Sequence, residues 1–387
     1  MSKIRDLLEK LCPKGIEYQS LDEVAEIKRG STITKSETSE GEIPVIAGGQ
    51  KPAYYHNESN REGETIAVAG SGAYAGFVSY WNTPVFVSDA FTVRPMTNSL
   101  KTKFCFYFLK SLQTELHAMK SGGGVPHVYG KDVGKLRIPT PPVEIQEEIV
   151  RILDTFTELE AELEAELEAR KTQYEYYRES LFSRHVSKHK SLDSVASIWR
   201  GRRFVKDDIR SEGVPAIHYG EIYTKYGLAA TETYSFLDPE LAAKLRFVSS
   251  GDVVLVSAGE TIEDIGKSFT WLGEEDAVIH DACYGIRSSV IDPRYMVHFF
   301  NTHNFRSQLR KYISSSKISA ISTEKLGKVF IPVPSTEEQK AIADALDSID
   351  CLISDSNVGL PAEIAARRQQ YEYYRNRLLT FKKLEVA

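Results

Sequence analysis

The chain has 387 residues, of which 42% are hydrophobic and 26% charged, a composition typical of an ordinary folded protein with two or three cores. No apolar run approaches the roughly 20 residues of a membrane span, and charges within residues 1–14 interrupt the apolar core that a signal peptide needs. The four cysteines stand far apart, which argues against a paired-cysteine zinc site or a disulfide framework. We expect a cytoplasmic protein with reduced thiols and no membrane contact.

The charge is unevenly distributed along the chain. The formal net charge is −6, but residues 154–168 contain seven acids and no base, whereas residues 188–210 contain seven bases and three acids. The net negative charge therefore does not exclude a local basic face of the kind that binds nucleic acid.

Three segments of the sequence occur twice, in the same order and at similar spacing. The repeat unit is far longer than a solenoid repeat, so we interpret the chain as two domain-sized copies. The pairs are Ser-Leu-Asp-Glu-Val-Ala at 20–25 and Ser-Leu-Asp-Ser-Val-Ala at 191–196, Gly-Lys-Leu-Arg-Ile-Pro at 134–139 and Gly-Lys-Val-Phe-Ile-Pro at 327–332, and Tyr-Glu-Tyr-Tyr-Arg at 174–178 and 371–375.

The first copy begins with a predicted α+β domain over residues 18–140. Short β-type runs such as 65–69 and 84–87 are separated by Gly, Asn, Ser and Pro turns. One amphipathic helix is predicted at 103–120.

A long helical spacer is predicted next, over residues 141–186. Pro141 and Pro142 favour a helix start, and no further proline or glycine follows before Ser183. At about 1.5 Å per residue, some 40 helical residues reach roughly 60 Å. Apolar residues alternate at spacings of four and three, as in a coiled-coil seam: Ile145, Ile149, Ile152, Phe156, Leu159 and Leu163.

The second copy repeats this order, with an α+β domain over 187–334 and a helical spacer over 335–387. Strands are predicted at 252–257 and 277–279, and a helix at 293–312. The second spacer has four extra residues around 357–361, where we expect the helix to break and Pro361 to open a new one. The two seams should pair, at the simplest to hold the halves together, although a rigid pair also fixes the distance between domains.

No arrangement of residues indicates catalysis. The histidines lack metal-ligand spacing, and no phosphate-binding loop or cofactor-binding glycine turn is present. We interpret the chain as non-catalytic, although an enzyme with a dispersed site remains a third interpretation.

Glycine-, hydroxyl- and base-rich loops recur at matching places in both copies. Lys and Arg suit phosphates, so these loops are candidates for DNA contact. The residues best suited in kind to touch bases are Gln50, Tyr54, His127, Arg202, Arg203 and Tyr219. The candidate residues are Arg29, Ser31, Thr32, Lys35, Gln50, Lys51, Tyr54, Ser71, Tyr74, His127, Arg202, Arg203, Lys206, Tyr219, Tyr223, Lys225, Ser268 and Lys317.

The chain resembles, over essentially its whole length, the specificity subunit of type I restriction-modification systems. The resemblance rests on the Pro-x-Pro entries into glutamine-containing helices at 138–146 and 331–339, the Tyr-Glu-Tyr-Tyr-Arg ends, the Leu-Asp-x-Val-Ala domain starts and the segment 6–13. It implies two α+β target-recognition domains, related by a pseudo-twofold axis and joined by two long helices packed as an antiparallel coiled coil. It also implies that residues 1–17 pack with the C-terminal helical region.

The resemblance further implies that each domain reads one half of a bipartite target in double-stranded DNA, with the helices setting the half-site spacing. Two methyltransferase subunits and two restriction subunits are the implied partners. S-adenosylmethionine, ATP and Mg are expected on those partners, and no cofactor on this chain. The alternative is a bivalent adaptor whose two domains hold ligands other than DNA.

Overall fold

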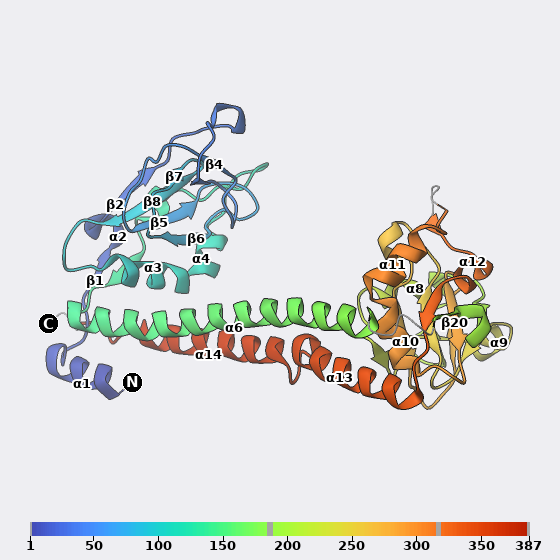
Figure 1. Ribbon diagram of the computed structural model, residues 1–387. Coiled ribbons are helices and arrows are strands. Elements are labelled where there is room, and N and C mark those ends of the chain that lie inside the picture. Colours follow the sequence, from blue (N-terminus) through green and yellow to red (C-terminus); the bar gives the residue numbers. More distant parts are fainter. Residues whose placement is uncertain (1, 184–188, 315–318, 385–387) are drawn as a thin grey trace. The chain divides into compact units, whose positions relative to one another are not determined.

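The computed structural model describes residues 2–183, 189–314 and 319–384. The chain divides into two compact units, Met1–Glu164 with Glu363–Ala387, and Ala165–Ala362 (Figure 1). Each unit holds one α+β domain and its own share of the long helices, which confirms the predicted fold class.

The first unit is built on an antiparallel sheet of order β2-β8-β5-β6 and a smaller mixed sheet of order β4-β3-β7. A short β1-β9 pair lies at the start and end of the domain. The strands are β1 (Tyr18–Ser20), β2 (Ala25–Arg29), β3 (Ile43–Ile46), β4 (Tyr54–His56), β5 (Thr65–Ala69), β6 (Val78–Trp81), β7 (Phe86–Val87), β8 (Ala90–Pro95) and β9 (Arg137–Pro139). The helices before the long spacer are α1 (Ser2–Leu11), α2 (Leu21–Val24), η1 (Lys35–Glu37), α3 (Thr102–Ser111), α4 (Gln113–Ala118) and α5 (Gly130–Val133).

Strand β5 is buried on both faces, because the two sheets and α3 enclose it. Ile66 and Val68 belong to the core beneath α3, whereas Ala67 faces the second sheet with Ile46 and Val87. This alternation follows from the twofold period of side chains along a strand.

The second unit repeats this arrangement. Its main sheet has the order β11-β20-β16-β18-β13 and its smaller sheet the order β14-β12-β19-β15. The strands are β10 (His189–Ser191), β11 (Ser197–Arg200), β12 (Val214–Ile217), β13 (Ala229–Ala230), β14 (Ser235–Leu237), β15 (Phe247–Val248), β16 (Val253–Val256), β17 (Ala258–Gly259), β18 (Ser268–Trp271), β19 (Ala277–Ile279), β20 (Cys283–Arg287), β21 (Ser319–Ala320) and β22 (Phe330–Pro332). The helices are α7 (Leu192–Val195), η2 (Lys206–Asp208), α8 (Tyr219–Ile222), α9 (Pro239–Ala242), η3 (Ile262–Asp264), α10 (Pro293–Phe300), α11 (His303–Arg310) and α12 (Thr323–Gly327).

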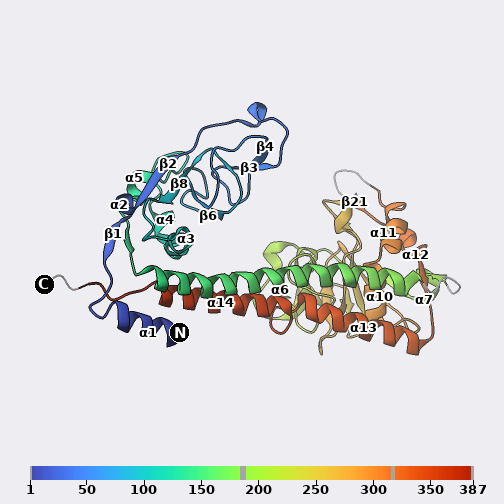
Figure 2. The same cartoon turned by 60° about the vertical axis from the view of Figure 1, so that its left-hand side comes forward.

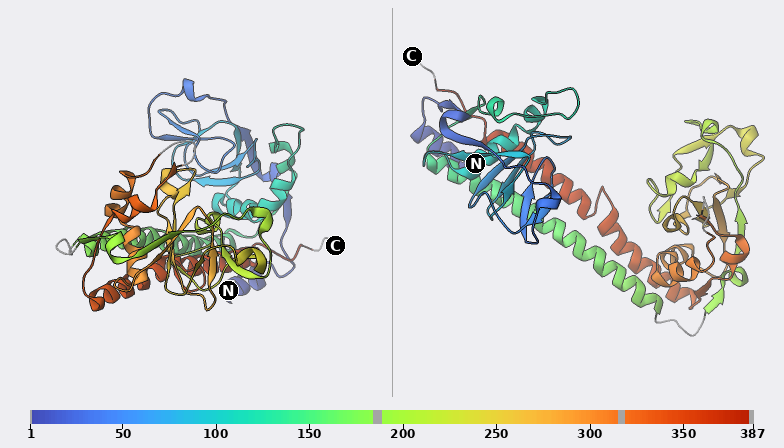
Figure 3. Two further views of the ribbon diagram at one scale, coloured as in Figure 1. Left: turned by 90° about the vertical axis from the view of Figure 1, so that its right-hand side faces the viewer. Right: turned by 90° about the horizontal axis from the view of Figure 1, so that it is seen from above.

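The long helices are α6 (Val143–Ser183), α13 (Thr336–Ser354) and α14 (Leu360–Leu378). The expected interruption falls between α13 and α14, where the Asp355 carboxylate accepts hydrogen bonds from the N–H groups of Asn357 and Val358. Figure 1 and the right-hand view of Figure 3 both show α14 running beside the first part of α6.

Within the first unit, α6 and α14 pair in antiparallel fashion. The Phe156 ring stacks on Tyr374 with ring centroids 5.5 Å apart, and one turn further along α6 the Glu160 carboxylate meets Arg368 at 2.5 Å. The predicted seam is only partly correct, because Leu159 is 42% exposed, whereas Leu153, outside the predicted seam, is fully buried. The physical reason is that the first turns of α6 pack on the α+β domain, so the buried face follows that contact as well as the partner helix.

A buried glutamine joins the domain to the helix in the first unit. Gln146 is fully buried, and its Oε1 accepts the Lys101 N–H at 2.9 Å, just before α3 begins. Its Nε2 donates to the carbonyls of Ser99 (2.6 Å) and Pro141 (2.7 Å). One side chain thus satisfies polar backbone groups of both segments, which fixes α3 against the start of α6.

The second unit uses Gln339 in the same way. Its Oε1 accepts the Asp292 N–H at 2.8 Å, and its Nε2 donates to the carbonyls of Val290 (3.1 Å) and Pro334 (3.0 Å). We call these two contacts the glutamine joints.

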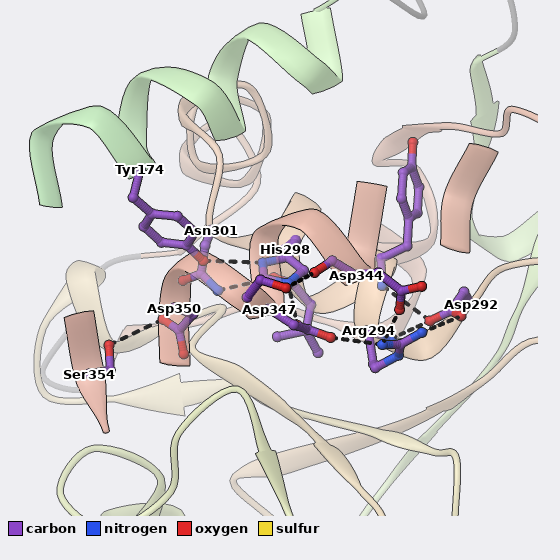
Figure 4. A network of polar contacts seen from close by, with 12 residues as sticks. Tyr174, Asp292, Arg294, His298, Asn301, Asp344, Asp347, Asp350 and Ser354 are labelled. Atoms are coloured by element: carbon purple, nitrogen blue, oxygen red, sulfur yellow. Dashed lines mark hydrogen bonds and ion pairs between the residues drawn. The ribbon is translucent and has the colours of Figure 1, made fainter. Parts of the chain in front are cut away.

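About two turns further along each helix, an aspartate makes a second side-chain contact with the domain. Asp154 accepts hydrogen bonds from Lys103 at 2.7 Å and Tyr107 at 2.5 Å in the first unit. In the second, Figure 4 shows Asp347 of α13 between Arg294 (2.8 Å) and the buried His298 (2.7 Å) of α10.

The repeated Tyr-Glu-Tyr-Tyr-Arg segments contribute tyrosines to these cores. The Tyr174 hydroxyl lies 3.2 Å from Nδ1 of His298 in the second unit (Figure 4), and Tyr371 packs on the core of the first. Arg178 and Arg375 lie over the rings of Tyr174 and Tyr371, 5.1 and 5.5 Å from their centroids.

The beginning of the chain packs with its end inside the first unit (Figure 2). Lys3 of α1 meets Glu148 of α6 at 2.8 Å, and the Ile16 N–H donates to the Lys382 carbonyl at 2.8 Å. Ile4 shares the core of this unit with Leu378 and Leu379.

Candidate nucleic-acid interface

In the first domain, the segment after β2 lies across the end of β7. The N–H groups of Gly30 and Ser31 donate to the carbonyls of Ala90 and Val87, both at 2.9 Å. A Cβ on residue 30 would lie 2.3 Å from the Val87 carbonyl oxygen, so this close approach requires glycine. The crossing places Arg29 and Ser31 at the sheet edge with their side chains exposed.

Two further loops meet at the same edge. The Tyr54 hydroxyl donates to the Ile33 carbonyl at 2.5 Å, which ties the 48–54 loop to the 30–35 loop. Residue 48 is also a glycine in close contact, since a Cβ there would lie 2.4 Å from the Ser71 carbonyl oxygen.

The glycine-rich loop 121–127 closes the group. Ser121 and His127 exchange backbone hydrogen bonds at 2.9 and 2.8 Å, and the N–H of Gly72 donates to the Pro126 carbonyl at 2.9 Å. The structure therefore brings together the four loops that carry the candidate residues of the first copy.

A cavity of about 500 Å³ opens beside this edge. Arg29 and His127 line it, together with Tyr129 and Lys131, which are not among the residues predicted from the sequence. His127 stacks on Tyr129 with ring centroids 5.9 Å apart, and Lys131 lies 5.6 Å from the Tyr129 centroid. The signal that could have found them is their position directly after the glycine-rich loop.

In the second domain, the basic segment after β11 makes the equivalent crossing. The N–H groups of Gly201 and Arg202 donate to the carbonyls of Cys283 (3.0 Å) and Ile279 (3.2 Å). The side chains of Arg202, Arg203 and Lys206 are exposed. The Arg202 guanidinium donates to the Lys244 carbonyl at 2.6 Å, so this side chain is partly held by its own domain.

Beneath this segment lies a ring cluster of Phe204, His218, Tyr219 and His280, with neighbouring centroids 4.5 to 6.0 Å apart. Burial lowers the pKa of both His218 and His280, which favours their neutral forms. Tyr219 is among the residues predicted from the sequence to contact DNA, whereas His218 and His280 are not.

Two further candidates of the second domain, Tyr223 and Lys225, differ in exposure and in their partners. Burial raises the pKa of the half-buried Tyr223, whose ring lies under Lys267, with the ammonium 4.6 Å from the centroid. Lys225 is exposed and pairs with Glu221 at 3.6 Å.

The candidate residues fall into three groups by exposure. Ser71 and Ser268 are buried at 9% and 8% exposure, and the Ser71 hydroxyl donates to Asp89, so neither serine offers a free surface to a duplex. Lys317 lies outside the described residues. Exposed side chains are those of Arg29, Ser31, Thr32, Lys35, Gln50, Lys51, Tyr74, Arg202, Arg203, Lys206 and Lys225, and half-buried ones are those of Tyr54, His127, Tyr219 and Tyr223.

Within residues 2–183, 189–314 and 319–384, no group of three His, Cys, Asp or Glu side chains is placed to hold a metal ion. Over the same ranges, no helix is both long and apolar enough to cross a membrane.

The chain is similar to known proteins over most of its length. The model of the family "type I restriction modification DNA specificity domain" matches residues 13–169 and again 187–366. A putative type I restriction enzyme specificity subunit of Haemophilus influenzae is 27% identical, covering 98% of this chain and all of that protein. The EcoR124I/EcoR124II specificity subunit of Escherichia coli is 28% identical, covering 75% of this chain and 73% of that protein.

The fold is also found in a solved structure. The crystal structure of a type I restriction-modification S subunit from M. genitalium superposes with a TM-score of 0.59 at 18% identity, covering 94% of this chain and 96% of that one. Since the family model matches both copies, the chain belongs to the type I restriction-modification DNA specificity family.

Proposed function

We propose that this chain is the DNA-reading subunit of a type I restriction-modification complex, and that each α+β domain reads one half of a bipartite target. The observation that carries the proposal is the repeated sheet edge. Both domains place a glycine-bearing crossing at the end of a parallel strand pair, β3 with β7 and β12 with β19, yet the side chains there differ. Equivalent scaffolds with different polar loops are suited to two different base sequences.

The contact surface we propose consists of the exposed and half-buried candidates of both domains. Arg and Lys bind phosphates and supply affinity, while Gln50, Tyr54, His127 and Tyr219 lie among them and touch bases. Ser71 and Ser268 are left out of this surface because they are buried.

Methylation and cleavage are carried out by partner subunits in this proposal. S-adenosylmethionine, ATP and Mg bind to those partners, in the cytoplasm. Support for two methyltransferase and two restriction subunits comes from the repetition of the helical parts, which offers two equivalent docking surfaces. The helix α6 is continuous from Val143 to Ser183 and contributes to both compact units, which suits a spacer that sets the half-site distance.

The experiment is selection of random duplexes by the chain in complex with its methyltransferase partner. Two short fixed blocks separated by a constant gap are the expected result. Recovery of one contiguous block, or of none, would contradict the proposal and favour an adaptor for other ligands. A salt titration of the selected duplex provides a second measurement, because binding through phosphates weakens steeply as salt rises.

A further inference from the structure

Two histidines occupy one edge of the smaller sheet in the second domain. Strands β12 and β19 run parallel, with Ala216 opposite Val278 and Ile217 opposite Ile279, so both strands end at the same level. The next residues are His218 and His280, whose ring centroids are 4.9 Å apart.

His280 has a structural role at this edge. Its Nδ1 accepts the Ala282 N–H at 3.1 Å, and its Nε2 lies 3.1 Å from the Phe204 carbonyl, to which it donates. Both ring nitrogens are therefore occupied in the neutral ring, and the Phe204 ring holds it edge-on at 5.0 Å. His280 therefore packs against His218 and helps to position its ring.

His218 has one nitrogen left for a ligand. Its Nδ1 accepts the Gly220 N–H at 3.2 Å, so the single proton of the neutral ring lies on Nε2. In the described parts of the chain, Nε2 has no hydrogen-bond partner, and the ring is half-buried between Phe204 and Tyr219. The result is one N–H donor of fixed tautomer and fixed direction.

Two carboxylates near His218 are already paired with other groups of the domain, and the exposed charges around it are basic. Glu221 accepts the backbone N–H of His218 at 3.2 Å and the Ser235 hydroxyl at 2.7 Å, so its carboxylate is already occupied. Asp281 faces His280 at 3.2 Å and Arg200 at 3.8 Å. Outside these pairs lie the exposed Arg203 and Lys206, whose positive charges further disfavour protonation of His280 and His218 respectively.

We propose that His218 is a specificity-determining residue of the second domain, whose Nε2–H donates to a hydrogen-bond acceptor on a base edge. This proposal rests on the proposed function. The acceptors available in the major groove are purine N7, guanine O6 and thymine O4, whereas the amino groups of adenine and cytosine are donors that this N–H rejects. Arg203 and Lys206 bind the flanking phosphates and hold the duplex in register.

The first domain cannot use the same contact. The residues that follow its parallel strands β3 and β7 are Ala47, whose side chain has no polar atom, and Ser88, which is buried at 4% exposure. The edge of the second domain therefore reads a base that the edge of the first does not.

The test is random-duplex selection by the complete complex carrying His218→Ala or His218→Gln. We expect His218→Ala to reduce the preference at one position of the second half-site by about 3- to 10-fold, the worth of one hydrogen bond. The other positions and the whole first half-site should be unchanged. Glutamine keeps an N–H donor and should restore part of the preference.

The matched control is His303→Ala, an exposed histidine of the same unit on α11, which should leave every position unchanged. An unaltered preference in His218→Ala, or an equal weakening of both half-sites, overturns the assignment of His218. Failure of the wild-type complex to select any bipartite target would instead refute the proposed function, and the assignment would fall with it.

Discussion

The two units share the hydrogen bonds between a buried glutamine and the backbone, but they differ in the side chains that bind the aspartate further along the helix. Gln146 and Gln339 each make three hydrogen bonds with equivalent backbone groups of their own units. The aspartates that follow are Asp154, bound by a lysine and a tyrosine, and Asp347, bound by an arginine and a histidine. The contact that must keep its geometry is the one made to the backbone, because main-chain groups do not change when side chains diverge.

The reading edges differ much more than the joints. The first domain has Ala47 and Ser88 after its parallel strands, and the second has His218 and His280 in the same places. The two copies therefore retain the glutamine contacts that position each domain on its helix, and they differ in the side chains at the edge proposed to face DNA.

Changing the length of α6 within residues 159–170 should have the largest effect, which is on binding to the DNA target. Inserting or deleting four residues within 159–170 moves the parts of α6 on either side by about 6 Å and rotates them by about one turn. We expect about 100-fold weaker binding to the original target, since one half-site loses its specific contacts. Selection should recover the same two half-sites at a different gap; altered half-sites at the original gap would contradict the spacer role.

Removing either glutamine should have similar effects in the two units. Gln146→Ala and Gln339→Ala each leave buried backbone groups without a partner, and we expect each to lower the free energy of unfolding by about 2–4 kcal/mol. Denaturant titration of the complete chain measures this loss. Gln146→Glu keeps the acceptor but points a carboxylate oxygen at the carbonyls of Ser99 and Pro141, so at neutral pH we expect it to lower the free energy of unfolding at least as much as alanine does. A loss confined to one copy would show that the joints are not equivalent.

A contact in the first unit should make its stability depend on pH, with a smaller effect on the free energy of unfolding than the loss of a glutamine. Hydrogen bonds from Arg151 and Lys3 lower the pKa of the buried Glu148 carboxyl from 4.5 to about 2, and the equivalent position in the second copy is Ala341. A lowered pKa stabilises the folded state above pH 4.5, and this contribution is lost as pH falls toward 2.

Because the cations facing Glu148 are exposed and screened, we expect it to contribute only about 1 kcal/mol. Denaturation at pH 7 and pH 3 should show that Glu148→Gln removes this part of the pH dependence. The control Glu147→Gln changes a neighbouring exposed carboxylate and should leave the pH dependence intact. An unchanged pH dependence in Glu148→Gln would rule out this contact as its source.

Much of the fold follows from local pattern. Strands at 65–69 and 277–279 match β5 and β19, because continuous apolar runs bounded by turn residues have few other ways to be buried. The helix predicted at 103–120 is instead two helices, α3 and α4, with Leu112 between them, and the one at 293–312 divides where Thr302 caps α11. Helix breaks of this kind follow from packing and from local caps, which hydrophobic periodicity does not resolve.

By itself, the sequence determined the duplication, the α+β class, the long helix and the residue types available for binding, since these depend on periodicity and composition. Tertiary structure alone decided which candidates lie together. The loops that carry Arg29, Tyr54 and His127 lie together because segments far apart in the chain cross one sheet edge, and Ser268 is excluded because it faces the interior. Only the tertiary structure showed that the repeated glutamine joins each domain to its helix, and that His218 lies at the edge of the smaller sheet of the second domain. The glutamine contacts, for example, join residues 45 and 47 positions apart, and no local sequence pattern encodes such partners.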